Sequence, residues 1–211
     1  PGPVMHYPDY LDELLAGVYV RCAAITLQLL EAGASVREIY EGLFAGGLQE
    51  VGHLWETNRI SVAREHLATA VTERLMALLA PRIFAEEHLD RTAVVSCTAN
   101  ELHQVGGRMV ADTLEMNGWH ARFLGAGTSP EDLEARIDEN SPDLVALSLA
   151  LPSNLPPLVR VLERLRERYP GTPVVLGGQA FRITGRDLPN RFSSVTILDS
   201  LGELEAFIRN I

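Results

Sequence analysis

The sequence contains no lysine, so all 18 of its basic residues are arginines. A phosphate-accepting receiver domain pairs an acidic cluster with a lysine, and this absence leaves that function poorly supported. Positive charge is scarce in general: the net charge of −10 argues against a broad basic face for nucleic acids. The sequence has no run of 18 apolar residues, so we expect no membrane span. It also has no basic segment followed by an apolar one, so we expect no signal peptide.

Cysteine is also scarce, and the two that occur, Cys22 and Cys97, each lie in an apolar stretch. We interpret them as buried, reduced thiols of a cytoplasmic protein. The chain has no CxxC and no Cys/His pairs at ligand spacing, which argues against structural zinc. It has no P-loop, and no G-x-G-x-x-G follows the first predicted strand. No nucleophile–base pair is evident, so we do not expect an enzyme.

Residues 8–88 read as successive helices, because apolar residues recur at positions i, i+3, i+4 and i+7. We expect a break near Gly17. Ser35 is expected to be a helix N-cap that forms a capping box with Glu38, and Ser61 is a second expected N-cap. Three or four helices with short connections predict a small helical bundle.

Residues 91–211 show a different pattern, in which short apolar runs alternate with helical segments. The runs are TAVVSC, HARFLG, DLVALSLA, PVVLGG and SVTILDS. This alternation predicts a five-stranded parallel sheet with right-handed crossovers, in the flavodoxin-like (Rossmann-type) doubly wound arrangement. We place the boundary between the helical and α/β parts near residues 86–91. Ligands of such sheets bind at the carboxyl ends of the strands, near the topological switch point.

His103 lies just past the carboxyl end of the first predicted strand. Glu101 is near enough to accept a hydrogen bond from one imidazole nitrogen, which leaves the other as a lone-pair donor for a metal. Gly106 and Gly107 would let a large flat group approach the start of the next helix. From these residues alone, an ordinary histidine at a helix N-terminus beside a glycine turn is the favoured interpretation.

The segment from Glu101 to Gly106 has the form E-x-H-x-x-G, which resembles the D-x-H-x-x-G signature of cobalamin-binding domains. The resemblance implies that His103 is the lower axial ligand of cobalt and replaces the dimethylbenzimidazole base. It also implies that the displaced nucleotide tail enters a slot in the flavodoxin-like domain. Glu101 departs from the family's aspartate, but it can serve the same acceptor role.

Further family marks follow in order along the chain. Ser148 resembles the serine of the S-x-L motif that contacts the buried nucleotide base, although Ala150 stands where that motif has leucine. Gly125 fits the turn after the second strand. Gly177 and Gly178 resemble the glycine pair beside the tail.

In the helical half, Trp55, Val62, Glu65 and His66 form a W-x6-V-x2-E-H pattern. Taken singly, a helical tryptophan is usually a core residue, and charged helix residues usually face solvent. The pattern nevertheless resembles the cap of cobalamin photoreceptors of the CarH/LitR type, and this resemblance extends over residues 8–211. It implies that the bundle caps the upper face of the cofactor and that these four residues surround a 5′-deoxyadenosyl group.

The resemblance implies a sensor of adenosylcobalamin, in which light breaks the Co–C bond and the bundle shifts, changing an oligomer or effector interface. In the photoreceptors, the residue after the cap tryptophan is a histidine that binds cobalt after illumination; here it is Glu56, with His53 and His66 nearby. No winged helix-turn-helix is recognisable, so we do not expect this chain alone to bind DNA. Two alternatives remain: a corrinoid methyl carrier, and a related sensor with a second or different tetrapyrrole (bilin or haem).

Overall fold

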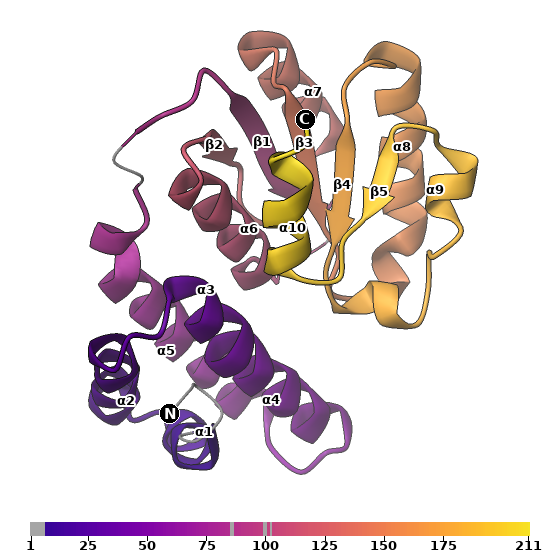
Figure 1. Ribbon diagram of the computed structural model, residues 1–211. Coiled ribbons are helices and arrows are strands. Elements are labelled where there is room, and N and C mark those ends of the chain that lie inside the picture. The colour runs from indigo at the N-terminus through magenta and orange to yellow at the C-terminus, as the bar shows by residue number, and fades with distance from the viewer. Residues whose placement is uncertain (1–6, 85–86, 99–100, 102) are drawn as a thin grey trace. The chain divides into compact units, whose positions relative to one another are not determined.

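The computed structural model describes residues 7–84, 87–98, 101 and 103–211 (Figure 1). The chain forms two compact units that divide between Ile83 and Phe84. We refer to them as the helical unit and the sheet unit. Residues 85 and 86, which belong to the last predicted helix and the predicted boundary, lie outside the described residues. Within the described part of the chain, no helix combines the length and apolar character needed to cross a membrane.

The helical unit follows the predicted pattern of helices with short connections. Its elements are α1 (Tyr7–Ala16), α2 (Tyr19–Glu31), α3 (Val36–Ile39), the π-helical η2 (Tyr40–Ala45), α4 (Gly46–Glu56), α5 (Val62–Leu79) and the 3-10 turn η3 (Ala80–Arg82). The predicted break occurs at Gly17, which adopts a φ of +71° that favours glycine. Tyr10, Tyr40 and Phe44 are fully buried and stack at the centre of the unit.

Both predicted N-caps of this unit are confirmed. The Ser35 hydroxyl accepts from the Glu38 backbone N–H at 3.2 Å, and the Glu38 carboxylate accepts from the Ser35 N–H at 2.8 Å. Ser61 accepts from the Arg64 N–H at the start of α5. The expected helical continuation towards residue 88 is wrong, because α5 ends at Leu79. Pro81 has no backbone N–H to donate to the preceding turn, and the chain continues as the 3-10 turn η3.

The sheet unit has the predicted parallel sheet of five strands. The strands are β1 (Thr92–Cys97), β2 (His120–Phe123), β3 (Leu144–Ser148), β4 (Val174–Gly177) and β5 (Val195–Ile197). Their spatial order is β2-β1-β3-β4-β5, with every neighbouring pair parallel. This is the flavodoxin-like order, and the chain changes direction across the sheet between β1 and β3.

Helices cover both faces of this sheet (Figure 1). The helical elements are α6 (Val105–Met116), α7 (Pro130–Asn140), η4 (Pro152–Asn154), α8 (Leu155–Arg168), η5 (Gln179–Arg182), α9 (Leu188–Arg191) and α10 (Leu201–Ile208). One core cluster packs α6 and α10 on the sheet, and the other packs α7, α8 and α9. The three inner strands β1, β3 and β4 are nearly all buried and largely apolar, because helices cover both of their faces. The edge strand β2 instead alternates exposed and half-buried residues.

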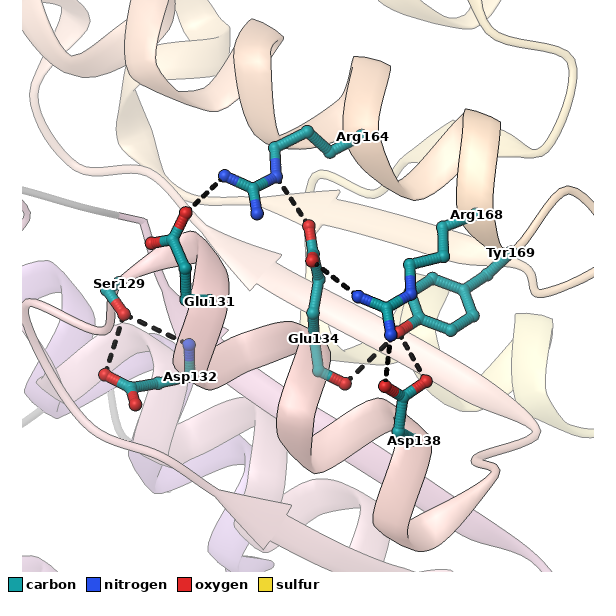
Figure 2. Close-up of polar contacts among 8 residues, drawn as sticks. All are labelled: Ser129, Glu131, Asp132, Glu134, Asp138, Arg164, Arg168 and Tyr169. Atoms are coloured by element: carbon teal, nitrogen blue, oxygen red, sulfur yellow. Dashed lines mark hydrogen bonds and ion pairs between the residues drawn. The ribbon is translucent and has the colours of Figure 1, made fainter.

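Polar contacts join α7 to α8 on the outer side of the second cluster (Figure 2). Glu134, which is buried, accepts from Arg164 Nε at 2.6 Å and from Arg168 Nη1 at 2.9 Å. The Tyr169 hydroxyl donates to Asp138 at 2.7 Å. Because one carboxylate serves two guanidinium groups, these contacts fix how the two helices lie against each other.

Gly178 is the point of closest backbone approach in the sheet unit. It follows β4 with a φ of +117°, and a Cβ added there would lie 2.2 Å from the carbonyl oxygen of Leu149. The backbones are also hydrogen-bonded, since Leu149 N donates to Gly177 O at 2.9 Å and Ala180 N donates to Leu149 O at 3.3 Å. The chains after β3 and β4 can therefore meet only if residue 178 has no side chain.

We expect Gly178→Ala to lower the free energy of unfolding by about 2 kcal/mol or more, because it combines backbone strain with a clash against another backbone. Gly177→Ala is the matched control, since its added Cβ meets only Leu198 O, at an ordinary 3.6 Å. Urea unfolding of the cofactor-free protein measures both. Equal losses in the two variants would contradict the packing role of Gly178.

Candidate functional site

The candidate site lies at the carboxyl ends of β1 and β3, which are neighbours in the sheet. The β1–α6 connection carries Glu101 and His103, and the β3–α8 connection carries Ala150, Leu151 and Asn154. The chain leaves β1 towards β2 on one side, and it leaves β3 towards β4 on the other. The two connections therefore diverge at the switch point, where open α/β sheets bind ligands.

Glu101 ties these two connections together, although its side chain is fully buried. Its Oε1 accepts from the backbone N–H of His103 at 3.0 Å and lies 2.6 Å from His103 Nδ1. Its Oε2 accepts from the backbone N–H groups of Ala150 and Leu151, each at 3.0 Å. The side-chain amide of Asn154 donates to the same oxygen at 3.3 Å. One carboxylate thus serves five donor groups from two loops.

These donors determine the charge of Glu101. Burial is the largest single influence and opposes ionisation, but the hydrogen bonds from His103, Leu151 and Ala150 together outweigh it and lower the pKa of Glu101 to about 2. Glu101 is therefore a carboxylate at neutral pH. Since an ionised carboxylate only accepts hydrogen bonds, the proton between the two side chains belongs to His103 Nδ1.

The neutral imidazole of His103 is thereby held in one tautomer, with the lone pair on Nε2. This is the form in which a histidine binds a metal while its other nitrogen donates to a second group. Its side chain is 43% exposed, so the imidazole lies at the surface above a buried anchor. Burial and the nearby Glu101 charge raise the pKa of the Cys97 thiol to about 12. The protonated thiol donates to the His103 carbonyl at 3.6 Å. Leu102, between Glu101 and His103, lies outside the described residues.

Ser148 and Gly106 face each other beside this anchor. Ser148 is the last residue of β3, and Gly106 lies in the first turn of α6. A Cβ added at Gly106 would lie 3.5 Å from the Ser148 hydroxyl. Gly125 adopts a φ of +81°, its carbonyl accepts from Cys97 N at 3.1 Å, and a Cβ added there would lie 3.7 Å from Gln104 Oε1. The structure therefore brings four predicted positions, Ser148, Gly106, Gly125 and His103, to the same end of the sheet.

The remaining glycines have structural roles of their own. A Cβ at Gly107 would lie 3.0 Å from Phe123 and 3.1 Å from the Cys97 sulfur, so this glycine brings α6 close to the sheet instead of opening the surface to a ligand. Gly107 is buried, whereas Gly106 is exposed. Gly177 pairs with Ser148 in the β3–β4 register. Gly178 is required by its contact with Leu149.

The other predicted residues lie around the α4–α5 connection of the helical unit. Trp55 is in the last turn of α4 and is 40% exposed, and Val62 begins α5 and is 49% exposed. Glu65 and His66 lie on the same face of α5 as Val62. Glu65 Oε2 is 3.5 Å from His66 Nε2, and its Oε1 accepts from the Thr69 hydroxyl at 3.1 Å. Two apolar and two polar side chains thus lie at the ends of one short connection.

Sequence reasoning missed the partners of Glu101 in the β3–α8 connection. Asn154 lies 53 positions away along the chain, and the donors of Ala150 and Leu151 are backbone groups. No local pattern reports such contacts. Ala150 stands where the S-x-L motif has leucine. Its contribution to this site is its backbone N–H, which donates to Glu101.

We expect Glu101→Gln to lower the free energy of unfolding of the cofactor-free protein by about 3 kcal/mol. The amide brings an N–H₂ group against donors that all need an acceptor. The control is Glu139→Gln, which removes an exposed ion pair with Arg136 and should change stability by less than about 1 kcal/mol. Urea unfolding at pH 7 compares them. A loss at Glu101 no larger than at Glu139 would show that the carboxylate does not anchor the loops.

The lowered pKa of Glu101 also predicts a pH dependence. The unfolded chain takes up a proton at this group near its ordinary value of 4.5, whereas the folded chain does so near 2. Between these values the unfolded state binds more protons, so stability is full above about pH 4.5 and falls as the pH drops towards 2, by about 3 kcal/mol in total. Unfolding measured between pH 3 and 6 should show a shallower decline for Glu101→Gln than for the wild type.

Comparison with known proteins gives the family. Residues 91–197 match the family described as B12 binding domain, and residues 9–80 match a second family with the same description. The chain is 32% identical to the HTH-type transcriptional repressor CarH of Myxococcus xanthus over 82% of this chain. It spans 52% of the length of CarH.

Corrinoid proteins are also similar to this chain. Trimethylamine corrinoid protein 1 of Methanosarcina mazei is 22% identical over 75% of this chain and 72% of its own length. The solved structure of the Methanosarcina barkeri monomethylamine corrinoid protein superposes with a TM-score of 0.79, at 16% identity and over 92% of both chains, which shows a shared fold. With the matches over residues 9–80 and 91–197, these findings show that the chain belongs to the B12-binding domain family.

Proposed function

We propose that this chain is the sensory module of a cytoplasmic photoreceptor that binds adenosylcobalamin and signals without catalysing a reaction of its own. The bound cofactor supplies a Co–C bond that light can break. The chain supplies a ligand for the cobalt, a surface for the adenosyl group and an output surface. The observation that carries the proposal is the exposed Trp55 and Val62 beside Glu65 and His66 in the helical unit.

The sheet unit fits a corrinoid on its own geometry. His103 presents Nε2 with a lone pair, because the buried Glu101 carboxylate holds the proton on Nδ1 at 2.6 Å. Ser148 and the exposed Gly106 leave a small polar surface beside this ligand. A single axial nitrogen from the protein is what the cobalt of a corrinoid, already held by four ring nitrogens, requires.

The helical unit supports the adenosyl form of the cofactor. Trp55 and Val62 are exposed large apolar side chains at the two ends of one short connection, and the polar residues Glu65 and His66 follow near the start of α5. Exposed apolar side chains rimmed by polar groups are typical of a binding surface. An aromatic ring and a branched aliphatic side chain offer an apolar wall, and the Glu65–His66 pair offers hydrogen-bonding groups for a ribose and a purine. A methyl group would use little of this surface.

Loss of the adenosyl group would return Trp55 and Val62 to water. Covering these two apolar side chains with another protein surface would then lower the free energy. We propose that this difference between the loaded and the emptied state drives the change in an oligomer interface or an effector-binding surface. The residue after Trp55 is Glu56, so this position provides no histidine to bind the cobalt after illumination. The proposal includes no second tetrapyrrole, because neither matched family and none of the similar proteins reported above is named for one.

A corrinoid methyl carrier is the second candidate function. The observation in its favour is sequence similarity: trimethylamine corrinoid protein 1 of Methanosarcina mazei is 22% identical over 75% of this chain. This candidate shares Glu101, His103 and Ser148 with the first, and the two differ in which form of the cofactor the chain should prefer. A carrier should hold methylcobalamin at least as tightly as adenosylcobalamin.

Binding in the dark tests the choice. We expect the purified chain to bind adenosylcobalamin more tightly than methylcobalamin by calorimetric titration, and Trp55→Ala to weaken adenosylcobalamin at least tenfold while it changes methylcobalamin little. Burying an aromatic side chain contributes about 1.5–3 kcal/mol, and about 1.4 kcal/mol is tenfold in affinity. The control is Val20→Ala, which removes a 73% exposed side chain from α2. Tighter binding of methylcobalamin, unaffected by Trp55→Ala, would favour the carrier.

Illumination tests the sensor itself. Green light should change the absorption spectrum of the adenosylcobalamin-loaded chain and shift its elution volume in size-exclusion chromatography, whereas the methylcobalamin-loaded chain should keep its elution volume. His103→Ala should bind either form at least tenfold more weakly, because the axial ligand is lost. A spectrum that changes without any change in elution would argue against an oligomer-based output.

A further inference from the structure

Thr98 carries a buried hydroxyl that nothing in the described structure satisfies. It directly follows β1, only 3% of the residue is exposed, and its Oγ1 has no hydrogen-bond partner among the described residues. Other buried threonines differ in this respect. The hydroxyls of Thr26, Thr72 and Thr113 each donate to the carbonyl one turn earlier in their own helix, at 2.8–2.9 Å. Thr98 lies outside any helix and cannot make that bond.

An unsatisfied hydroxyl in this position costs stability, because folding removes it from water without replacing the lost hydrogen bond. Valine has the same shape and would avoid the cost. Buried polar groups in folded proteins nearly always have a partner, and an exception calls for an explanation. Since no described residue satisfies the hydroxyl, we consider a bound ligand as its partner.

The neighbours of Thr98 indicate where such a partner enters. Its backbone N–H donates to the carbonyl of Ser148 at 3.4 Å, and its carbonyl accepts from the N–H of Glu101 at 2.9 Å. Thr98 is thus hydrogen-bonded both to the last residue of β3 and to the backbone of Glu101, the residue whose carboxylate holds His103. The His103 side chain is 43% exposed, whereas Thr98 is buried. A macrocycle bound to His103 stays at the surface, so only a narrow extension of the ligand can reach Thr98.

We propose that the Thr98 hydroxyl is a binding residue for the nucleotide tail of the cobalamin. The inference rests on the assignment of a cobalamin to this site with His103 as its lower ligand. A threonine hydroxyl donates one hydrogen bond and accepts others, so it can pair with a phosphate oxygen, a ribose hydroxyl or a base nitrogen of the tail. Thr98 then acts on the tail, while Glu101 and His103 act on the cobalt.

The experiment compares cobalamin with cobinamide, which has the same corrin ring but no nucleotide. Calorimetric titration of the full chain should show that Thr98→Val weakens cobalamin binding about tenfold, which is the loss of one buried hydrogen bond of about 1.4 kcal/mol. Cobinamide binding should be unchanged. The urea midpoint of the cofactor-free variant should stay the same or rise, because an unsatisfied polar group has been removed.

Two variants serve as controls. Thr98→Ser keeps the hydroxyl and should retain most of the cobalamin affinity. Thr113→Val removes a buried hydroxyl of α6 that already has a partner, so it should lower stability without distinguishing the two corrinoids. Of these three variants, the proposal predicts that only Thr98→Val weakens cobalamin binding while leaving cobinamide binding unchanged.

Other results would overturn the inference. Equal cobalamin affinity of wild type and Thr98→Val would mean that the hydroxyl does not touch the tail. Equal weakening of cobalamin and cobinamide would mean that Thr98 acts through the Glu101 connection. Either result leaves the proposed function standing. If the wild type binds neither corrinoid, the proposed function fails and this inference fails with it.

Discussion

The buried Glu101 carboxylate is the interaction on which the candidate site depends. It accepts hydrogen bonds from the connection that carries His103 and from the backbone of Ala150 and Leu151 in the connection after β3. The two loops that diverge at the switch point are thereby joined through one anion. Because the charge is held inside the protein by the chain's own donors, the histidine is oriented before any ligand arrives, and binding does not have to order it.

Much of the fold could be predicted from the sequence, because the two units have different periodicities. The five apolar runs mark β1 to β5, and the serines at positions 35 and 61 mark helix starts by local chemistry. The errors came where a second rule overrode the periodic pattern. Pro81 ends α5 although apolar residues continue beyond it, and Gly107 serves helix–sheet packing although it stands beside the motif.

The site could be predicted only as far as its residues lie close together in sequence. Glu101 and His103 were paired because two positions separate them, and the structure confirms that contact at 2.6 Å. Asn154 and Thr98 could not be found in this way. Asn154 reaches Glu101 across 53 positions, and Thr98 is notable only because its buried oxygen has no partner among the described residues. Such facts depend on burial, which local sequence does not report.

Each of the two units contains one tryptophan, and the environments of the two tryptophans differ. The chain has two tryptophans; Trp55 of the helical unit is 40% exposed, whereas Trp119 of the sheet unit is 1% exposed. Indole emission shifts to shorter wavelengths in apolar surroundings, so the two fluorophores differ in colour without any label. Corrinoids absorb in the near ultraviolet and quench nearby indoles. The fluorescence of this chain can therefore report the environment of each unit separately.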